Sequence, residues 1–366
     1  MDRRSFIKKA GVGAGATVAA AALSTPAIAQ DRKEMVIVST WPRDFPGLGI
    51  SAQRLATRIP ELTDGRIQVT YFAAGEKVGA FDVLDEVSAG NSQAYIAADY
   101  YWKGKHPGWA YFTAVPFGFV YTEMEAWMKF GDGQALLDEL GAEFNIKGIP
   151  CGNTGLQMGG WFNKEINSPD DFKGLKMRIP GIAGDVLAKM GASPVAIPGG
   201  QIYENFISGA VDAAEWVGPY NDYFMKFHEA AKYYYYPGMH EPASMLNLGV
   251  NKSWWEGLSD LDKAIITAAC AEENSLQIAE VNFQNGIYLK RLIDEHGVEL
   301  RKFNDETYDA FGVAANEVFE EVRQHSPLAA KIHESFLKAR TEIGGWIALS
   351  DTAYTLQRNR VLGIES

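Results

Sequence analysis

The chain has few of the residues that enzymes and metal proteins most often use for chemistry. Its 366 residues include two cysteines, Cys151 and Cys270, and six histidines. It contains no Cys-x-x-Cys, His-Glu-x-x-His, Gly-x-Ser-x-Gly or Gly-x4-Gly-Lys-Ser/Thr motif. The sequence therefore carries no signature of a zinc site, a serine hydrolase or a P-loop nucleotide-binding protein, and an enzyme would have to act without a short motif.

Positive charge is also scarce. Lys and Arg number 34 against 46 Asp and Glu, which gives a formal net charge of -12. Binding to nucleic acid needs clustered Lys and Arg, so we expect no nucleic-acid partner. The same charge disfavours general attraction of anions, so an anionic ligand must be held by a local device such as a buried arginine or a metal ion.

Long apolar runs are absent after the N-terminal segment, which has the pattern of an export signal. Arg3 and Arg4 precede an uncharged stretch over residues 10–23, and residues 27–29 supply a small-x-small cleavage pattern. We therefore predict a twin-arginine (Tat) signal peptide over residues 1–29 and a mature protein in the periplasm of a Gram-negative bacterium. The uncharged stretch is short and rich in Gly and Ala, which disfavours the alternative of an uncleaved membrane anchor.

The two cysteines would then lie in a compartment that permits disulfides. Cys151 follows a predicted strand, and Cys270 lies in a predicted helix far along the chain. We therefore expect two buried free thiols rather than a disulfide.

The mature chain begins with alternating strands and helices. Apolar runs predict strands within residues 34–41 and 66–76, and helical periodicity predicts helices within residues 49–65 and 78–90. This alternation predicts an α/β fold with mostly parallel sheets. In such sheets, ligands bind beyond the carboxyl ends of the strands.

The length of the chain favours two lobes. Removal of residues 1–29 from the 366 leaves 337, which is more than a single core usually holds. A strand within residues 243–258 is expected to return to the first lobe, and the sequence from Ser259 to about Arg358 is predicted to be helical. The predicted domains are lobe I over residues 30–155 and 245–285, lobe II over residues 156–244 and 286–325, and C-terminal helices over residues 326–366.

A short strand places an arginine near its end. Residues 175–179 alternate apolar and basic side chains, and the Pro180-Gly181 turn stops this period-2 strand. Arg178 therefore lies at the mouth of a sheet. The alternative is a solvated surface cation, because charged residues are common at strand ends.

Two glutamates are expected near this arginine. Glu215 lies near the end of a predicted strand, and Glu241 follows the turn after the Tyr233–Tyr236 strand. In a parallel sheet, both should point into the region between the lobes. Two carboxylates beside Arg178 admit a structural ion pair, an acid/base pair for catalysis, or a bound cation. Spacing alone does not choose among these three interpretations.

Four segments together resemble a known family. They are GNTGLQMGGWF (152–162), DFKGLKMRIPG (171–181), GGQIYENFISGAVDAAEWVGPYND (199–222) and YYYYPG (233–238). They resemble the substrate-binding proteins of tripartite ATP-independent periplasmic (TRAP) transporters of the DctP type, and within these the branch that binds α-keto acids and includes a calcium-lactate binder. The resemblance runs from about Val36 to the C-terminal helices and is most specific between Gln157 and Trp216.

This resemblance implies a receptor that catalyses no reaction. Its fold would be the two-lobed periplasmic binding protein fold, with a hinge between the lobes. It would close over a small 2-oxo or 2-hydroxy monocarboxylate and deliver it to the small and large membrane subunits of a TRAP permease. A Na⁺ or Ca²⁺ ion would belong to the ligand site, with no catalytic cofactor. Relatives form dimers through swapped terminal helices, so a homodimer is expected.

The resemblance also implies the residues of the site. Arg178 would clamp the ligand carboxylate with two parallel hydrogen bonds, a geometry that Lys cannot reproduce. The metal ion would be held by Gln157, Glu215, the backbone carbonyl of Trp216, and Glu241. The other residues around the substrate would be Phe72, Tyr101 and Asn153, with Gln157 and Trp216 contributing to both sets.

One pair of residues departs from the pattern of that branch. Where two tryptophans are expected before the metal-site glutamate, this chain has Met239 and His240. The exchange would enlarge or polarise the pocket, so the ligand could be longer than pyruvate, although His240 could instead be a surface histidine. The competing classes are an exported metal-dependent enzyme that uses Glu215 and Glu241 on a small carboxylate, and a sensory binding protein that serves a receptor kinase.

Overall fold

The sheet of the first lobe combines four strands from the N-terminal half of the chain with one strand from later in the chain. The computed structural model describes residues 32–364. The sheet has the order β2 (Ile67–Phe72), β1 (Lys33–Ser39), β3 (Ala94–Ala97), β10 (Met245–Asn251) and β4 (Ile146–Asn153). β1 pairs in parallel with β2 and β3, whereas β10 runs antiparallel to β3 and β4. Every residue of β10 is buried, which fits its central place in the sheet.

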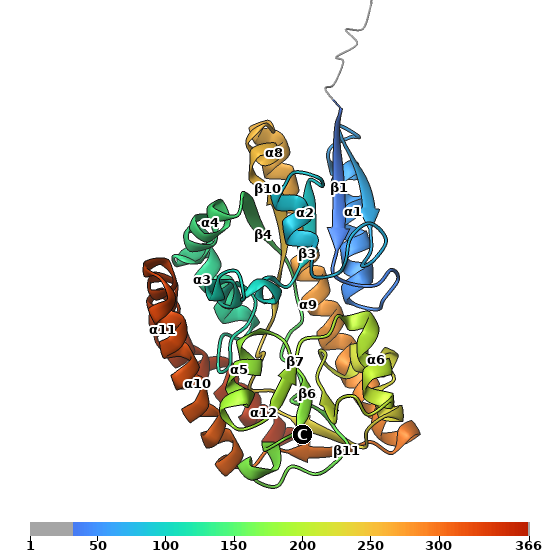
Figure 1. Cartoon of the computed structure of the whole chain (residues 1–366), viewed down its shortest axis with the longest axis vertical. Helices are drawn as coiled ribbons and strands as arrows, with labels where there is room; N and C mark the ends of the chain where they lie inside the picture. Colours follow the sequence, from blue (N-terminus) through green and yellow to red (C-terminus); the bar gives the residue numbers. More distant parts are fainter. Residues whose placement is uncertain (1–31, 365–366) are drawn as a thin grey trace, which may run out of the picture.

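Short helices cover this first sheet and continue the chain around it. They are α1 (Leu48–Leu62), α2 (Val83–Ser88), η1 (Asp99–Trp102), η2 (Pro107–Phe112), α3 (Tyr121–Phe130), α4 (Gly133–Glu143) and α8 (Lys252–Glu256). Figure 1 shows α1, α2 and α8 around the strands in the upper lobe. α1 buries Leu48, Leu55 and Ile59, which recur at helical spacing, so one face of the helix packs on the sheet.

The second lobe is built on a six-stranded sheet. Its order is β11 (Glu299–Lys302), β9 (Tyr233–Tyr236), β5 (Gly160–Phe162), β8 (Ala213–Ala214), β6 (Lys176–Arg178) and β7 (Ser193–Val195). Its helices are η3 (Pro169–Phe172), α5 (Gly181–Lys189), α6 (Gly199–Ile207), α7 (Pro219–Phe224) and η4 (Phe227–Glu229). β6 lies between β8 and β7 and pairs in parallel with both, so it is an interior strand of the sheet, and its residues Met177 and Arg178 are buried.

One long helix ties the two lobes together. α9 (Asp260–His296) packs against α1 and β4 of the first lobe and against α7 of the second. The Ser259 hydroxyl caps its N-terminus by accepting from the Asp262 amide at 3.1 Å. Gly297 adopts a left-handed conformation, with φ of 65°, and ends the helix.

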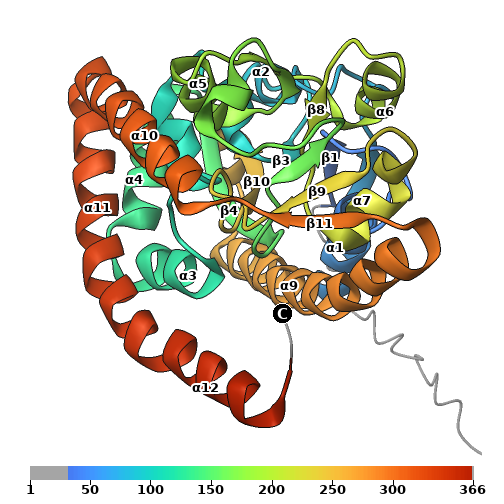
Figure 2. The ribbon, with the colours of Figure 1, turned by 90° about the horizontal axis from the view of Figure 1, so that it is seen from below.

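The C-terminal helices wrap both lobes and then leave the body of the molecule. They are α10 (Asp305–His325), α11 (Pro327–Ile347), the π-helical segment η5 (Ala348–Thr352) and α12 (Ala353–Leu362). α10 packs on α5, and α11 packs on η2 and α3. Phe319 and Phe336 are buried there, whereas Trp346 and Tyr354 are about two-thirds exposed, at 66% and 67%. Figure 2 shows α12 curving away from the two lobes.

The predicted two-lobed α/β architecture with C-terminal helices is confirmed. Both sheets are mixed, since five of the nine strand pairings within residues 32–364 are parallel. The expected return of a strand to the first sheet is β10. The region expected to be helical from Ser259 to about Arg358 is interrupted once, because Gly297 ends α9 and the following strand, β11, pairs in parallel with β9.

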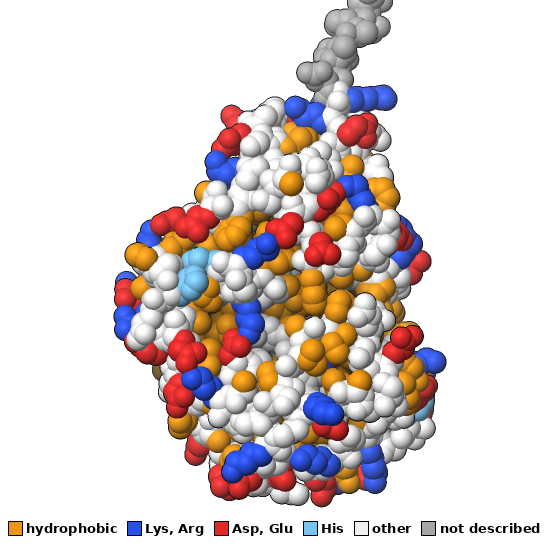
Figure 3. All heavy atoms as spheres, in the orientation of Figure 1, with side chains coloured by type: hydrophobic (Ala, Val, Ile, Leu, Met, Phe, Trp, Pro, Cys, Tyr) orange, Lys and Arg blue, Asp and Glu red, His pale blue; other side chains and the backbone are white. Residues whose placement is uncertain are grey.

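Several smaller expectations can also be compared with the structure. Cys151 and Cys270 are both buried, and within the described residues both are free thiols. Between residues 32 and 364, no helix is both long enough and apolar enough to span a bilayer. The predicted signal peptide, residues 1–29, lies outside the described residues, and the exact residue boundaries of the lobes stay predictions. In Figure 3, hydrophobic side chains gather across the middle of the face shown, between the two lobes.

Candidate functional site

The site begins with a buried arginine on an interior strand. Arg178 ends β6 and is 1% exposed, so the alternative of a solvated surface cation is wrong. Its Nη1 donates to the carbonyl oxygen of Glu215 at 2.7 Å and also to a carboxylate oxygen of the same residue. Its Nε donates to the Ile197 carbonyl at 3.2 Å. Nη2 is buried without a hydrogen-bond partner among residues 32–364.

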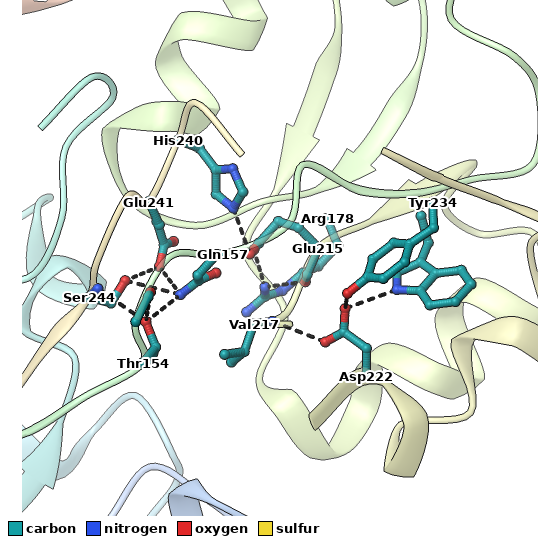
Figure 4. Close-up of polar contacts among 12 residues, drawn as sticks. Thr154, Gln157, Arg178, Glu215, Val217, Asp222, Tyr234, His240, Glu241 and Ser244 are labelled. Carbon is teal, nitrogen blue, oxygen red and sulfur yellow. Dashed lines mark hydrogen bonds and ion pairs between the residues drawn. The ribbon is translucent and has the colours of Figure 1, made fainter. Parts of the chain in front are cut away.

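Three side chains meet beside this guanidinium. Nε2 of His240 lies 3.2 Å from Oε2 of Glu215, and Glu241 lies next to His240 in the chain. One ligand atom from each of Glu215, His240 and Glu241 lies within 4.8 Å of the other two, and all three residues are at most 2% exposed. Figure 4 shows the three side chains converging, with Gln157 between Glu241 and the Arg178–Glu215 pair. We call these three residues, together with Gln157, the acidic centre.

A set of hydroxyl groups holds the far side of the acidic centre. Nε2 of Gln157 lies 2.8 Å from Oε2 of Glu241 and 3.1 Å from the hydroxyl oxygens of Thr154 and Ser244. The Ser244 hydroxyl also donates to Glu241. Oε1 of Gln157 is buried and accepts no hydrogen bond from the described part of the chain. An amide oxygen in this state is one of the donor types that a cation prefers.

Burial and neighbouring charge perturb the acids and bases of the centre. Burial, and then the charge of Glu215, raise the pKa of Glu241 to about 7. Burial alone would lower the pKa of His240, but its hydrogen bond to Glu215 and the two carboxylate charges raise it overall. Two carboxylates cannot both stay ionised in such a place without a nearby positive charge. Arg178 supplies one positive charge, which pairs with Glu215, so a second positive charge would be needed to keep Glu241 ionised as well.

Aromatic side chains from both lobes close the site. The Cζ atom of Arg178 lies 5.3 Å from the centroid of the Trp216 ring, and Phe45 of the first lobe meets that ring edge-on at 6.1 Å and 87°. A small cavity, with a volume of about 10 Å³, lies here. It is lined from both lobes, among others by Tyr101, Gln157 and Trp216. The lobes are thus shut over the acidic centre.

A third buried carboxylate fixes the segment that carries Glu215 and Trp216. Asp222 accepts hydrogen bonds from the Trp161 indole at 2.9 Å, the Tyr234 hydroxyl at 2.7 Å and the Val217 amide at 3.1 Å. Burial raises the pKa of Asp222 to about 7 despite these three donors. Figure 4 shows this group beside Arg178. It orients the strand end from which two site residues project.

The structure brings most of the sequence-predicted site residues together. Arg178, Glu215 and Glu241 converge with Gln157 and Trp216, and Tyr101 lines the adjoining cavity. The side-chain oxygen of Asn153 accepts from the Gly155 amide at 2.9 Å, so Asn153 shapes the loop before Gln157. Phe72 is half-buried at the end of the edge strand β2 and is not among the residues that line the cavity.

Sequence reasoning missed two members of the site and left the position of a third open. Thr154 and Ser244 are ordinary hydroxyl residues in the sequence, and only the fold brings them to Glu241. His240 stood out in the sequence, but its alternative as a surface histidine is wrong, since it is 2% exposed and bonded to Glu215. Its position next to Glu241 was the available signal.

Comparison with known proteins places this site in context. Residues 38–325 match the DctP family model, described as bacterial extracellular solute-binding protein, family 7. The chain is 38% identical over 318 residues, 87% of each chain, to a monocarboxylate 2-oxoacid-binding periplasmic protein of Nostoc sp..

Two solved structures are similar over nearly their whole length. A TRAP periplasmic solute-binding protein of Pseudoalteromonas atlantica, with bound sodium and pyruvate, is 38% identical with a TM-score of 0.86, covering 88% of this chain and 98% of that one. A TRAP transporter solute-binding protein of Bordetella bronchiseptica is 33% identical with a TM-score of 0.88, covering 91% and 98%. It is a mixed-occupancy dimer, with copurified calcium and picolinate in one active site and the other site apo. The chain described here belongs to the DctP family of bacterial extracellular solute-binding proteins.

Proposed function

We propose that this chain is the solute-binding receptor of a TRAP transporter, which captures a small 2-oxo or 2-hydroxy monocarboxylate together with a Na⁺ or Ca²⁺ ion. The observation that carries the proposal is the buried Nη2 of Arg178, which has no partner within residues 32–364 and lies beside the acidic centre. A buried guanidinium with a free N–H group is a site for a carboxylate. The likeness to the Nostoc, Pseudoalteromonas and Bordetella proteins supports the ligand class and the cation.

Electrostatics explain why the anion and the cation bind together. Each pair of negative charges about 5 Å apart repels by about 3 kcal/mol at an effective dielectric constant near 20. Glu215, Glu241 and a ligand carboxylate would form such pairs, and Arg178 alone compensates one charge. A cation among the glutamates, held also by Oε1 of Gln157 and the carbonyl of Trp216, would turn repulsion into binding.

The remaining predicted residues have supporting roles in this proposal. Tyr101 would pack against the ligand, because it lines the cavity with Gln157 and Trp216. Asn153 would hold the loop that presents Gln157. Phe72 would act at the outer rim of the pocket, from the end of β2.

The proposal extends to location, assembly and partners. Tat export through residues 1–29 would deliver the folded receptor to the periplasm, where it would present its ligand to the small and large TRAP membrane subunits. The receptor would act as a homodimer joined through its C-terminal helices. Support for the dimer comes from the apolar residues exposed on α12 and from the dimeric Bordetella relative. Closure on the ligand would be a hinge motion, because only the shut form contacts the ligand from both lobes.

Calorimetry with metal-stripped protein tests the proposal. Pyruvate, longer 2-oxo acids and their 2-hydroxy analogues are titrated with Na⁺, with Ca²⁺ and with chelator, and melting temperatures are read in parallel. We expect binding that requires a cation, with the ligand recovered unchanged by mass spectrometry. Turnover of the ligand would instead favour the metal-dependent enzyme, and no binding under any condition would refute the proposed receptor.

A further inference from the structure

A short loop of the first lobe contacts the second lobe directly, beside the ligand site. The loop is the segment before α1, residues 42–47, and its Pro46 carbonyl accepts a hydrogen bond from Nδ2 of Asn221 at 2.5 Å. Asn221 lies on α7 of the second lobe and is 1% exposed. We call the hydrogen bond between Asn221 and Pro46 the latch.

The loop is held in shape by α1, so the Pro46 carbonyl has a fixed direction. Oε1 of Gln53 accepts from the Asp44 amide at 2.7 Å, and Nε2 of the same side chain donates to the Asp44 carboxylate at 2.9 Å. The Gly47 carbonyl accepts from the Ser51 amide at 2.9 Å. The acceptor of the latch is therefore positioned before the lobes close, and little conformational entropy is lost when the bond forms.

Gly47 makes room for the side chain that forms the latch. Its φ is 75°, a conformation that favours glycine, and a Cβ atom at this position would lie 2.7 Å from Nδ2 of Asn221. A side chain on residue 47 would therefore push the carboxamide away from the loop. The donor on one lobe and the glycine on the other fit each other at one point.

The latch lies next to the ligand cavity but is not part of it. Neither Pro46 nor Asn221 is among the residues that line the cavity, whereas Leu48, two residues after Pro46, lines it together with Trp216. Because its two groups belong to different lobes, separation of the lobes breaks the latch. The latch therefore responds to closure and not to the chemistry of the ligand.

A second polar contact between the lobes provides a comparison. Nζ of Lys103, after η1 of the first lobe, lies 2.5 Å from Oδ2 of Asp185 on α5 of the second. The two side chains are 32% and 46% exposed, and an ion pair exposed to this degree contributes little because water and salt screen it. The buried hydrogen bond of Asn221 is expected to contribute more to closure.

We infer that Asn221 is a positioning residue that sets the apparent ligand affinity of this receptor by stabilising its shut form, without contacting the ligand. The apparent Kd of such a receptor equals the intrinsic Kd divided by the fraction of molecules in the shut form. The inference rests on the proposed function, because it needs a ligand on which the lobes close. It goes beyond that proposal by assigning part of the affinity to a residue outside the pocket.

Binding measurements on the full chain test this inference. Pyruvate and a longer 2-oxo acid are titrated by calorimetry, with Na⁺ and with Ca²⁺, into the wild type and Asn221→Ala. We expect Asn221→Ala to bind both ligands about 3- to 10-fold more weakly, by the same factor for each ligand and each cation. Stopped-flow dissociation should be faster by about that factor, since the latch is broken when the lobes open.

The control is an asparagine of the same lobe that makes no contact with the first lobe. Nδ2 of Asn205 donates to the Gln201 carbonyl within α6 at 2.8 Å, so Asn205→Ala removes a hydrogen bond without affecting closure. This variant should keep the ligand affinity of the wild type.

A second variant tests the latch from the first lobe. Gly47→Ala places a methyl group against the Asn221 carboxamide, so it should also weaken both ligands by at least about threefold. In the double variant Asn221→Ala with Gly47→Ala the methyl group meets no carboxamide, and the added loss should be smaller. Small-angle X-ray scattering of the ligand-free proteins should give a larger radius of gyration for both single variants than for the wild type.

The outcomes separate this inference from the proposed function. If Asn221→Ala binds as tightly as the wild type, or if its loss differs between the two ligands, the receptor stands and the latch is overturned. If Asn221→Ala does not fold, Gly47→Ala decides, and wild-type affinity in that variant overturns the latch. If the wild type binds no 2-oxo acid with any cation, the proposed function itself fails, and the inference fails with it.

Discussion

Arg178 carries a buried positive charge whose hydrogen-bonding capacity is only partly used inside the protein. Its Nη1 group donates to the Glu215 carbonyl and its Nε group to the Ile197 carbonyl, and these hydrogen bonds fix the plane of the guanidinium. Nη2 has no hydrogen-bond partner among the described residues. An unpaired buried donor lowers the stability of a protein by about 1–3 kcal/mol. We therefore expect an oxyanion to bind at the free side of this guanidinium.

Replacement of Arg178 by lysine should weaken the binding of every carboxylate ligand. A lysine keeps the charge but cannot hold Glu215 and the ligand in one plane. We expect a loss of about 1.5–3 kcal/mol, or roughly 10- to 100-fold in Kd, for pyruvate and its analogues. Calorimetry measures it, and Arg43→Lys is the control because the Arg43–Glu76 pair is well exposed. If Arg178→Lys binds these ligands with normal affinity, a residue other than Arg178 holds the ligand carboxylate.

A buried carboxylate in the first lobe should make the stability depend on pH. Burial raises the pKa of Asp99 to about 7 from 3.8, although the Tyr95 hydroxyl and Asn247 amide donate to it. The folded state thus holds a proton that the unfolded state releases, so the free energy of unfolding should fall as pH rises from about 4 to 7. The contribution is on the order of 1–4 kcal/mol.

Asp99→Asn should flatten this pH dependence. Thermal unfolding of the ligand-free protein between pH 5 and 8 measures how the free energy of unfolding depends on pH. Part of this dependence should remain in the variant, because burial also raises the pKa of Asp222 to about 7. Asp309→Asn, an exposed change on α10, is the control and should leave the slope unaltered. A slope in Asp99→Asn equal to that of the wild type would mean that Asp99 is ionised in the folded protein.

The resemblance to the family predicted the cluster of residues at the ligand site. Arg178, Gln157 and Glu215 stand in the segments that carry the resemblance, and Glu241 follows the last of these segments by three residues. The burial of Arg178 was not predictable from strand alternation, because alternation places Lys176 and Arg178 on the same face, yet Lys176 is exposed and Arg178 is buried. The inward position of His240 depends on packing between a loop and a strand end 25 residues apart, which local patterns do not encode.

Among the elements, the start of α6 controls the wall of the site. A Cβ atom at Gly199 would lie 2.3 Å from Cη2 of Trp216, so only glycine leaves room for the indole that lies over Arg178. A Cβ at Gly200, one residue later, would meet its nearest neighbour, Cγ of Pro42, at 3.7 Å, an ordinary contact. The two glycines therefore form a matched pair in one helix.

Gly199→Ala should displace Trp216 and weaken ligand binding, whereas Gly200→Ala should not. Overpacking of this kind costs about 1–3 kcal/mol of stability, and we expect a loss of ligand affinity of at least about tenfold. Gly200→Ala should stay within about 0.5 kcal/mol of the wild type. Unfolding in denaturant and calorimetry with pyruvate give both quantities. If the two variants have the same stability and the same pyruvate affinity, Trp216 is not part of the ligand site.

The elements also show where sequence patterns stop being informative. The helix predicted after Ser259 is present as α9, with a serine cap and a glycine stop that the sequence displays. β11 was missed because its four residues, Glu299–Lys302, have no strand pattern of their own. They become a strand only by pairing with the tyrosines of β9, which lie more than 60 residues earlier.

For the molecule as a whole, the chain crosses between the lobes more than once, and this was partly predictable. The apolar run of β10 indicated a central strand, and it does return to the first sheet between β3 and β4. The mixed direction of the strands was not predictable, because antiparallel pairing follows from that crossing and not from any local pattern. α9 then fastens both lobes, so the hinge must work against one continuous helix.

The last prediction concerns the part of the molecule that lies outside both lobes. α12 buries none of its residues, yet it carries large apolar side chains, including Leu356 at 66% exposure and Val361 at 69%. Apolar surface left exposed on a protruding helix is typical of an interface, and a stable dimer buries about 1,600 Å² in total. We therefore expect the wild type to have the mass of a dimer in light scattering and Leu356→Asp to have that of a monomer.

The control for this prediction is an exposed apolar residue outside the C-terminal helices. Phe130, at the end of α3, is 94% exposed, and Phe130→Asp should keep the dimeric mass because it lies outside the C-terminal helices. Pyruvate affinity should be unchanged in Leu356→Asp, since α12 contributes nothing to the cavity between the lobes. A wild type that is already monomeric, or a Leu356→Asp variant that stays dimeric, would mean that α12 is not the dimer contact. The exposed apolar face would then be free for a different partner, such as a membrane subunit.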